Sequence, residues 1–523
     1  MAAPFSKTDD SVVVIIGTGA GGGTLANELA QKGIPVVALE AGGRYLPEDY
    51  VNDEWASFAQ LAWLDTRRSD GSFRLARDFA GLPSWIVKAV GGTTTHWAGA
   101  SLRFQDHEWK ALTTYGRVEG ASLMDWPIDA AEMDPWYTRA EAKMGVTRTN
   151  GLPGLPGNNN YLVMEKGARA VGYDKVHTGR MAINSIAYGN RQACQQTGFC
   201  FQGCKWGAKW STAYTEIPLG EETGNLEVRE RCHAARIEHD DKGRVTGVVY
   251  FDADGVEQRQ AARLVCVAGN TIESPRLLLN SASSMFPDGL ANSSGQVGRN
   301  YMRHVTGSVY SIFEQPVRMW RGTVMAGIMQ DEAHHDPARG FVAGYELETL
   351  SLGLPFMAAF LDPGAWGREF TSALDGYENM AGMWIVGEDM PQETNRITVD
   401  TGVLDQFGLP TPVVHYDDHP NDVAMRDHAY ARGIAIHKAA GAVRSLPTPP
   451  YPSTHNIGSN RMSDNPRDGV VNRWGQSHDI PNLFVSDGSL FTTGAAENPT
   501  LTIVALAIRQ ADHIAREMGA GTL

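Results

Sequence analysis

Short, uninterrupted hydrophobic runs recur along the chain, and they predict strands that are buried on both faces. Runs rich in β-branched and aliphatic residues occupy residues 12–16, 36–39, 264–269 and 483–486. A continuous apolar run of this length is typical of a parallel sheet covered by helices. Residues 24–31, between the first two runs, have the composition of a helix. The pattern therefore predicts a βαβ unit at the start of an α/β fold.

The rest of the chain adds further strands and helices. Residues 226–267 read as several short strands separated by Asp- and Gly-rich turns, followed by a helix at 274–280. Residues 316–440 alternate strand-like stretches with scattered aromatic residues. A long apolar helix is predicted at 500–516, with Pro499 in its first turn, where proline is tolerated.

The first hydrophobic run leads into the glycine pattern G-x-G-x-x-G, formed by Gly17, Gly19 and Gly22. The first glycine permits a tight turn, the second lets the backbone approach a pyrophosphate, and the third lets the helix pack close to the strand. Glu40 ends the second run, 23 residues after Gly17, where it would accept hydrogen bonds from a ribose diol. This combination predicts a dinucleotide site rather than an ordinary glycine-rich turn, and it leaves nicotinamide and flavin both open.

Size and charge narrow the class of protein. A chain of 523 residues favours two domains, and a net charge of −15 argues against nucleic acid or an anionic membrane as a partner. No apolar run is long enough to span a membrane. The first residues, MAAPFSKTDD, lack the basic and apolar regions of a signal peptide. We therefore expect synthesis in the cytoplasm, with export only as the passenger of a signal-bearing partner.

Three of the five cysteines are clustered, with the spacing C-x5-C-x3-C. An odd, low cysteine count does not suggest a disulfide framework. Thiolates this close together suit a soft metal centre, and three ligands favour a 3Fe-4S cluster held by Cys194, Cys200 and Cys204. Zinc with a fourth ligand from elsewhere, or a set of unrelated thiols, are the alternatives. Cys232 and Cys266 fall in predicted strands and read as small core residues.

Taken together, the motifs resemble the glucose–methanol–choline (GMC) family of flavin oxidoreductases over almost the whole chain. The resemblance is to the bacterial branch that holds the large subunits of glucose, fructose, gluconate and sorbitol dehydrogenases. It rests on the N-terminal glycine pattern, AVGGTTTHW at 89–97, SPRLL at 274–278, NRI at 395–397, STHNIGSNRM around His455, and VSDGSLF and ENPTLTIVALA near the C-terminus.

This resemblance implies FAD as the cofactor and two domains. The FAD-binding domain would be Rossmann-like and discontinuous, formed by residues 1–105, 205–315 and 440–523. The substrate-binding domain would be α+β, built on an antiparallel sheet from residues 106–190 and 316–440. Residues 191–204 would form the iron–sulfur loop.

The resemblance also implies the residues that contact FAD. The glycine and threonine segment after residue 90 would bring backbone N–H groups close to flavin or phosphate. His96 is the candidate for covalent attachment to the 8α carbon of the flavin, as in the similar segment of pyranose oxidases; the alternative is a histidine hydrogen-bonded near the flavin. The implied contacts are Gly17, Gly19, Gly22, Glu40, Gly91, Gly92, Thr93, Thr94, His96, Asp487, Gly488, Asn498 and Pro499.

His455 and Asn498, 43 residues apart, match the catalytic pair of the family. A neutral imidazole suits removal of the hydroxyl proton, and Asn498 would hold the substrate oxygen against that base. The N-terminus of the last predicted helix would stabilise negative charge on the reduced flavin. One departure is Arg303, which stands where many members have an aspartate before the following histidine, so no role of that acid is transferred.

A cluster near the flavin would give electrons a route to another protein. Relatives in this branch pair with a small subunit that carries the export signal and with a cytochrome c-type acceptor. We therefore expect an exported, periplasmic protein, with a cytoplasmic one as the alternative. The expected activity is FAD-dependent oxidation of a secondary or anomeric hydroxyl of a sugar, an aldopyranose or a glucoside.

Other functions stay open at this point. They are a dioxygen-using enzyme similar to pyranose oxidase, a gluconate or sugar-alcohol dehydrogenase, and an electron-transfer or scaffold subunit that has lost its chemistry. The intact pair of His455 and Asn498 counts against the last of these. Trp320, Trp366 and Trp384 could stack on a sugar ring, but none is singled out.

Overall fold

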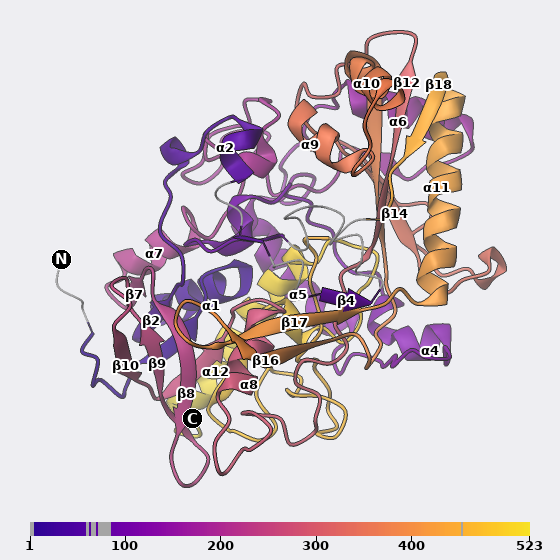
Figure 1. The fold of residues 1–523 in the computed structure, drawn as a ribbon. Helices are drawn as coiled ribbons and strands as arrows, with labels where there is room; N and C mark the ends of the chain where they lie inside the picture. The colour runs from indigo at the N-terminus through magenta and orange to yellow at the C-terminus, as the bar shows by residue number, and fades with distance from the viewer. Residues whose placement is uncertain (1–4, 59–61, 64–68, 72–84, 451–452) are drawn as a thin grey trace.

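The computed structural model describes residues 5–58, 62–63, 69–71, 85–450 and 453–523. A parallel sheet with the strand order β19-β11-β1-β2-β7 forms one side of the molecule (Figure 1). Its strands come from the start, middle and end of the chain: β1 (Val13–Ile16), β2 (Val36–Leu39), β7 (Leu226–Arg229), β11 (Leu264–Val267) and β19 (Leu483–Val485). The four strands that correspond to the hydrophobic runs are buried along their whole length.

Helices cover this sheet and fix the glycine-rich turn. α1 (Ala20–Gln31) packs against α12 (Thr500–Ala520) and α7 (Glu216–Glu222), and α12 packs against α5 (Ala130–Met144). α1 begins four residues before the predicted start, because glycines of low helix propensity form its first turn. These glycines are required by close packing: a Cβ at Gly21 would lie 1.7 Å from the carbonyl oxygen of Ser486.

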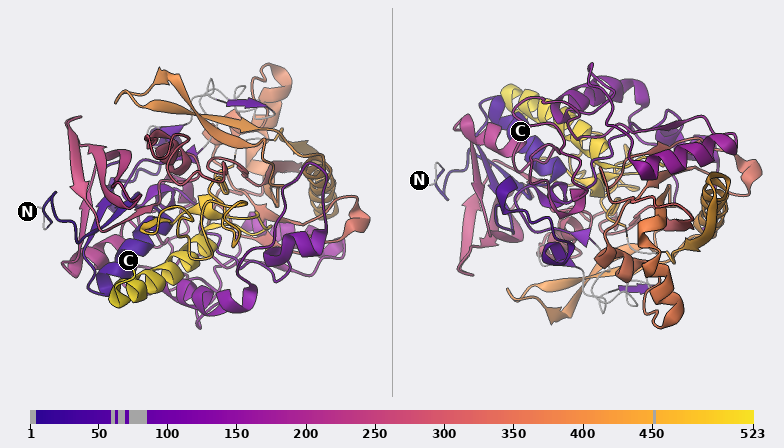
Figure 2. Two further views of the ribbon diagram at one scale, coloured as in Figure 1. Left: turned by 90° about the horizontal axis from the view of Figure 1, so that it is seen from below. Right: turned by 90° about the horizontal axis from the view of Figure 1, so that it is seen from above.

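A second, antiparallel sheet of six strands stands on the other side of the molecule (Figures 1 and 2). In the order β18-β12-β15-β14-β13-β6, its strands are β18 (Ala442–Pro447), β12 (Val305–Phe313), β15 (Met380–Gly387), β14 (Tyr345–Thr349), β13 (Ile328–Met329) and β6 (Val176–His177). α6 (Asn159–Ala170) and α11 (Pro420–Ala440) pack against each other and against this sheet. Glu348 of β14 is paired with Trp384 of β15, so the two side chains share one face of the sheet.

Smaller elements complete the fold. α8 (Glu273–Asn280) packs on a three-stranded antiparallel sheet of β8 (His233–His239), β9 (Val245–Phe251) and β10 (Glu257–Ala261). A second small sheet contains β16 (Arg396–Leu404), β17 (Pro410–Tyr416) and β4 (Ser69–Gly71), and β3 (Ala62–Trp63) pairs with β5 (Trp85–Ile86). The other α-helices among the described residues are α2 (Glu54–Phe58), α4 (Ala111–Tyr115), α9 (Leu354–Phe360) and α10 (Arg368–Asp375). Short 3₁₀ helices are η1 (Pro47–Asp49), η3 (Gly92–Thr95), η4 (Glu108–Lys110), η5 (Cys200–Gln202), η6 (Pro337–Arg339), η7 (Tyr377–Asn379) and η8 (Gly488–Leu490).

The predicted α/β fold class, in which a parallel sheet is combined with a larger antiparallel sheet, is confirmed. The domain boundaries stay a prediction; β12 and β18 come from ranges assigned to the FAD-binding domain, yet they pair within the antiparallel sheet. The placement of Cys232 in a strand was wrong, because it lies in the turn between β7 and β8. Across the described part of the chain, no helix is both long enough and apolar enough to cross a membrane.

Candidate active site

A cavity of about 390 Å³ lies at the carboxyl ends of the parallel strands. Its lining includes residues just after four neighbouring strands. Gly17, Glu40 and Ala268 directly follow β1, β2 and β11, and Asp487 lies two residues after the end of β19. This edge of an α/β sheet is where such folds bind their ligands. The opposite wall comes from the antiparallel sheet and its connections, and it is mostly apolar: Met325, Leu350, Leu352, Phe360 and Trp384.

The three fingerprint glycines have distinct geometries. Gly17 has φ +99°, and a Cβ there would lie 2.3 Å from the Ala268 carbonyl oxygen. A Cβ at Gly22 would lie 2.1 Å from the Gly17 carbonyl oxygen, so Gly22 serves helix packing and does not line the cavity. Gly19 is different, because the nearest atom to its built Cβ is the Gly92 Cα at 3.9 Å. No side chain therefore crowds the backbone at the start of α1.

Glu40 is a buried carboxylate that ties the glycine turn together. Its Oε2 accepts hydrogen bonds from the Thr18 N–H at 3.1 Å and the Thr18 hydroxyl at 2.7 Å, and its Oε1 accepts from the Gly42 N–H at 2.9 Å. Burial raises the pKa of Glu40, and the bonds from Gly42 and Thr18 lower it in part. The Thr18 hydroxyl also accepts from the Gly91 N–H at 3.1 Å, which links the two glycine segments.

The second glycine segment lies against the first. Gly91 and Gly92 have φ +97° and +53°, and η3 begins there. The Thr94 hydroxyl donates to the Gly91 carbonyl at 2.6 Å. Gly92, Thr93 and Thr94 line the cavity, whereas Gly91 supports the turn from behind.

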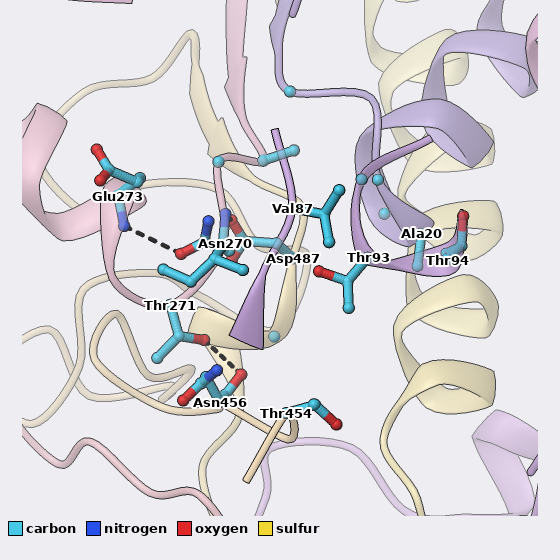
Figure 3. Close-up of a pocket in the computed structure, with 18 of the residues that line it drawn as sticks. Ala20, Val87, Thr93, Thr94, Asn270, Thr271, Glu273, Thr454, Asn456 and Asp487 are labelled. Atoms are coloured by element: carbon cyan, nitrogen blue, oxygen red, sulfur yellow. Dashed lines mark hydrogen bonds between the residues drawn. The ribbon is translucent and has the colours of Figure 1, made fainter. Parts of the chain in front are cut away.

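Asp487 connects the turn after β11 to the turn after β19. Its Oδ2 accepts from the Asn270 N–H at 2.9 Å and from the Ser274 hydroxyl at 2.5 Å, and its Oδ1 accepts from the Ser489 N–H at 2.8 Å. In Figure 3, Asp487 and Asn270 lie on one side of the pocket and Thr93 on the other. Asp487 and Gly488 thus line the predicted FAD cavity, and the carboxylate also holds its walls.

His96 is buried and lines the same cavity. Its Nδ1 lies 2.7 Å from the Phe201 carbonyl oxygen. A carbonyl oxygen can only accept, so Nδ1 carries the proton in the neutral ring and Nε2 carries a lone pair. Burial lowers the pKa of His96 to about 4, which keeps the ring neutral near pH 7.

His455 and Asn498, the predicted catalytic pair, both line the cavity. Burial lowers the pKa of His455 well below its usual value, and the neighbouring His304 lowers it further. Asn498 is buried, and its Nδ2 donates to Glu348 Oε2 at 3.5 Å. An amide nitrogen carries two N–H groups, so one remains for a substrate oxygen. Trp384 packs against His455 with 5.2 Å between the ring centres. Pro499 and Thr500 bring the N-terminus of α12 to the same cavity.

The three clustered cysteines line a separate, small cavity of about 20 Å³. The Gln196 N–H lies 3.4 Å from Cys194 Sγ, and the Lys209 N–H lies 3.5 Å from Cys204 Sγ. Burial raises the pKa of the Cys194 thiol to about 12. Among the residues with a described position, no group of three or more His, Cys, Asp or Glu side chains is arranged to hold a metal ion.

Comparisons with known proteins decide the family. Two family models match the chain, both described as GMC oxidoreductase, over residues 82–306 and 391–507. The chain belongs to the GMC oxidoreductase family. It is accordingly an FAD-dependent oxidoreductase that acts on CH–OH groups, as the resemblance implied.

Its relatives include dehydrogenases that match over nearly the full length of both chains. It is 32% identical to 2-methyl-1,2-propanediol dehydrogenase of Mycolicibacterium austroafricanum, over 98% of this chain and 96% of that one. It is 29% identical to the fructose dehydrogenase large subunit of Gluconobacter japonicus, over 99% and 100%. Among solved structures, pyridoxine 4-oxidase from Mesorbium loti superimposes with a TM-score of 0.71 at 16% identity, over 97% and 99% of the two chains.

Three buried polar residues were given no role by the sequence motifs. His304 contacts His455, Glu348 contacts Asn498, and Lys209 joins the two loops that contain His96 and the cysteines. Arg303, the departure from the family pattern, is buried with its guanidinium 4.5 Å from the centre of the Tyr416 ring.

Proposed function

We propose that this GMC oxidoreductase is a dehydrogenase that oxidises a secondary or anomeric hydroxyl of a sugar and passes the electrons to an external acceptor. The observation that carries the proposal is that an imidazole with a lowered pKa, His455, and a buried amide, Asn498, line the same cavity. A neutral base beside a hydrogen-bond donor is what removal of a hydroxyl proton requires.

The residues around Gly19 and Glu40 suit the binding of FAD in this cavity. The backbone is bare at Gly19, where a pyrophosphate would approach, and the N-terminus of α1 opens there. Glu40 directly follows β2, at the position for a ribose contact. When bound, FAD supplies the acceptor for the hydride that leaves the substrate carbon.

The chain's own groups do the acid–base work in this proposal. Nε2 of His455 takes the hydroxyl proton, and the Asn498 amide holds the same oxygen in place. Trp384, packed on the His455 ring, excludes water from that side. The N-terminus of α12, which follows Asn498 directly, stabilises negative charge that develops at this end of the cavity.

The proposed substrate is an aldopyranose or a glucoside. The similarity to a fructose dehydrogenase large subunit over the full length of both chains supports a sugar. A small branched diol is the second candidate. It is favoured by the apolar wall of Leu350, Leu352 and Phe360 and by the similarity to 2-methyl-1,2-propanediol dehydrogenase.

We further propose that His96 carries the flavin covalently. The hydrogen bond from Nδ1 to Phe201 leaves the lone pair on Nε2, and a nucleophilic nitrogen is what attachment to the flavin requires. The low pKa of His96 supports this role, because it keeps the ring unprotonated at neutral pH.

A 3Fe-4S cluster is the proposed second cofactor. Cys194, Cys200 and Cys204 would hold it, and it would supply one-electron transfer to an external acceptor. The donor set supports this: three thiols face one cavity, and two of the sulfurs are near backbone N–H groups. The cavity would have to open to admit a cluster. The proposed partners are a small subunit with an export signal and a cytochrome c-type acceptor, in the periplasm.

A substrate panel tests the activity directly. Purified protein with bound FAD is mixed with glucose, fructose, gluconate, sorbitol, a methyl glucoside and 2-methyl-1,2-propanediol, with an artificial electron acceptor or with air alone. Dye reduction by a sugar with little peroxide in air supports the proposal. Turnover with the diol alone selects the second candidate, and peroxide formed as fast as dye is reduced identifies an oxidase. No turnover with any sugar contradicts the proposal.

A further inference from the structure

His304 is in direct contact with the proposed base, His455. Its Nδ1 lies 3.1 Å from the Nδ1 of His455, and the two rings meet edge to face, with centres 5.0 Å apart and planes at 87°. His304 is completely buried, whereas His455 is partly open and lines the cavity. Two nitrogens at this distance share one proton, so the protonation of one ring dictates that of the other.

The opposite edge of His304 decides which ring donates. Its Nε2 lies 3.3 Å from the Gly494 carbonyl oxygen, which can only accept a hydrogen bond. Burial lowers the pKa of His304 to about 4, so the ring is neutral and has a single N–H. With that proton on Nε2, the Nδ1 of His304 is an acceptor. His455 must then donate its Nδ1–H to His304, and its lone pair lies on Nε2.

The backbone holds His304 in this position at a conformational cost. Its φ is +65°, in the left-handed region that non-glycine residues rarely occupy, and such residues concentrate at functional sites. Asp389 fixes the turn: its Oδ1 accepts from the His304 N–H at 3.0 Å and its Oδ2 accepts from the Arg303 N–H at 2.8 Å. Asp389 is itself buried, and its Oδ2 also accepts a longer hydrogen bond from the Tyr416 hydroxyl at 3.5 Å.

We propose that His304 is a positioning residue that holds the Nδ1–H of His455 and thereby directs the unprotonated Nε2 of His455 to the substrate hydroxyl. The inference rests on the proposed role of His455 as the base. During proton transfer the substrate O–H bond breaks and an N–H bond forms at Nε2, while the Nδ1 proton stays on His455 and remains hydrogen-bonded to His304.

Two substitutions distinguish a positioning role of the His304 side chain from a role in packing alone. His304→Leu keeps most of the side-chain volume but removes the acceptor. His304→Asn keeps an acceptor oxygen close to the former Nδ1, and asparagine tolerates the left-handed backbone. We expect His304→Leu to lower kcat by roughly 10- to 100-fold, with KM and FAD content close to those of the wild type, because His455 is still present but its Nε2 is no longer held unprotonated toward the substrate. We expect His304→Asn to recover most of the rate.

His455→Ala, measured in parallel, distinguishes a failure of the proposed base role of His455 from a failure of the positioning role of His304. If His455→Ala keeps its turnover, the proposed base is wrong. If His455→Ala is inactive but His304→Leu is as active as the wild type, or His304→Asn is as impaired as His304→Leu, the base stands and the positioning role of His304 is overturned.

A measurement on the wild-type holoenzyme covers the case in which His304→Leu does not fold. Histidine side chains are labelled with ¹⁵N, and the His455 signals are identified by their loss in His455→Gln. The proposal expects a protonated Nδ1 and an unprotonated Nε2 at pH 7. The reverse assignment overturns it, whether or not any sugar is a substrate.

Discussion

The Nδ1 atom of His96 lies 2.7 Å from the carbonyl oxygen of Phe201, a residue between Cys200 and Cys204 in the chain. The segment proposed to carry the flavin is thus hydrogen-bonded to the loop proposed to carry the cluster. Lys209 joins the same segments, because its Nζ donates to the carbonyl oxygens of Trp97 at 2.6 Å and Cys200 at 2.7 Å. The two loops form one structural unit, whose parts can be tested separately.

His96→Ala is expected to release the flavin on acid precipitation, whereas wild-type protein stays yellow in the pellet. The reason is that only Nε2 of His96, left unprotonated by the bond from Nδ1, is available for attachment at this point of the cavity. Absorbance of pellet and supernatant, with the intact mass of the polypeptide, measures the linkage. His428→Ala is the control, since His428 does not line the cavity. A wild-type mass without an adduct would show that the flavin is not covalently bound.

Serine in place of Cys194, Cys200 or Cys204 should remove the iron. Each thiol lines the small cavity, and an iron–sulfur cluster depends on all of its thiolate ligands. Iron content and the low-temperature EPR spectrum of anaerobically purified protein are the measurements. Cys266→Ser is the control, because Cys266 is buried in β11. Wild-type protein that is folded and yellow but contains no iron would exclude the cluster.

Lys209→Met should destabilise the junction between the two loops. The Nζ group is buried and donates to three carbonyl oxygens, those of Thr95, Trp97 and Cys200. Leaving buried acceptors without a donor costs about 1–3 kcal/mol each, so we expect the melting temperature to fall by roughly 5–10 °C. Differential scanning fluorimetry is sufficient for this measurement, and Lys205→Met is the matched control at a neighbouring exposed lysine. A change in Lys209→Met no larger than in the control would contradict the bridging role.

The sequence alone predicted the strands of the parallel sheet, because strands that are buried on both faces appear in a sequence as continuous apolar runs. It was insufficient where tertiary packing overrides local preference. The start of α1 consists of glycines, which are poor helix formers but the only residues that fit against Ser486. The long helix α11 was missed among strand-like segments. It packs against both α6 and the antiparallel sheet, so its apolar residues do not form one clear stripe.

Within the site, the motifs predicted His455 and Asn498 because local sequence patterns surround both residues. No local pattern surrounds the pair that His304 forms with His455, which are 151 residues apart, or the contact between Glu348 and Asn498, which are 150 apart. Such partners are set by the way β14, the start of β12 and the segment before α12 come together in the folded chain. A single sequence does not contain that information in readable form.

Glu348→Gln should stabilise the protein increasingly as the pH rises. Burial raises the pKa of Glu348 from 4.5 to about 8, with a smaller opposing effect from Asn498. The folded state therefore keeps a proton that the unfolded state loses above pH 4.5, so the stability from this group is full below that pH and is lost as the pH rises through 8. Glutamine resembles the protonated form and does not ionise.

The measurement is the difference in melting temperature between Glu348→Gln and wild type at about pH 5.5 and pH 8.5. Most of the stability that the Glu348 proton contributes is lost between these two pH values. We expect the difference to be larger at the higher pH by several degrees. Glu369→Gln, at an exposed position of α10, serves as the control. A difference that is the same at both pH values would mean that Glu348 is ionised in the folded protein throughout.

The acid limb of kcat/KM should lie well below pH 6.5, the usual pKa of histidine. Activity requires an unprotonated His455, and burial together with His304 lowers the pKa of that imidazole, so turnover persists to lower pH than for an exposed histidine. Asn498→Ala is the informative control. It should reduce kcat/KM by roughly 10- to 100-fold without moving the acid limb toward higher pH, because an amide positions the substrate but does not titrate. An acid limb at or above pH 6.5 in the wild type would mean that His455 is more accessible to solvent than its packing against Trp384 and His304 implies.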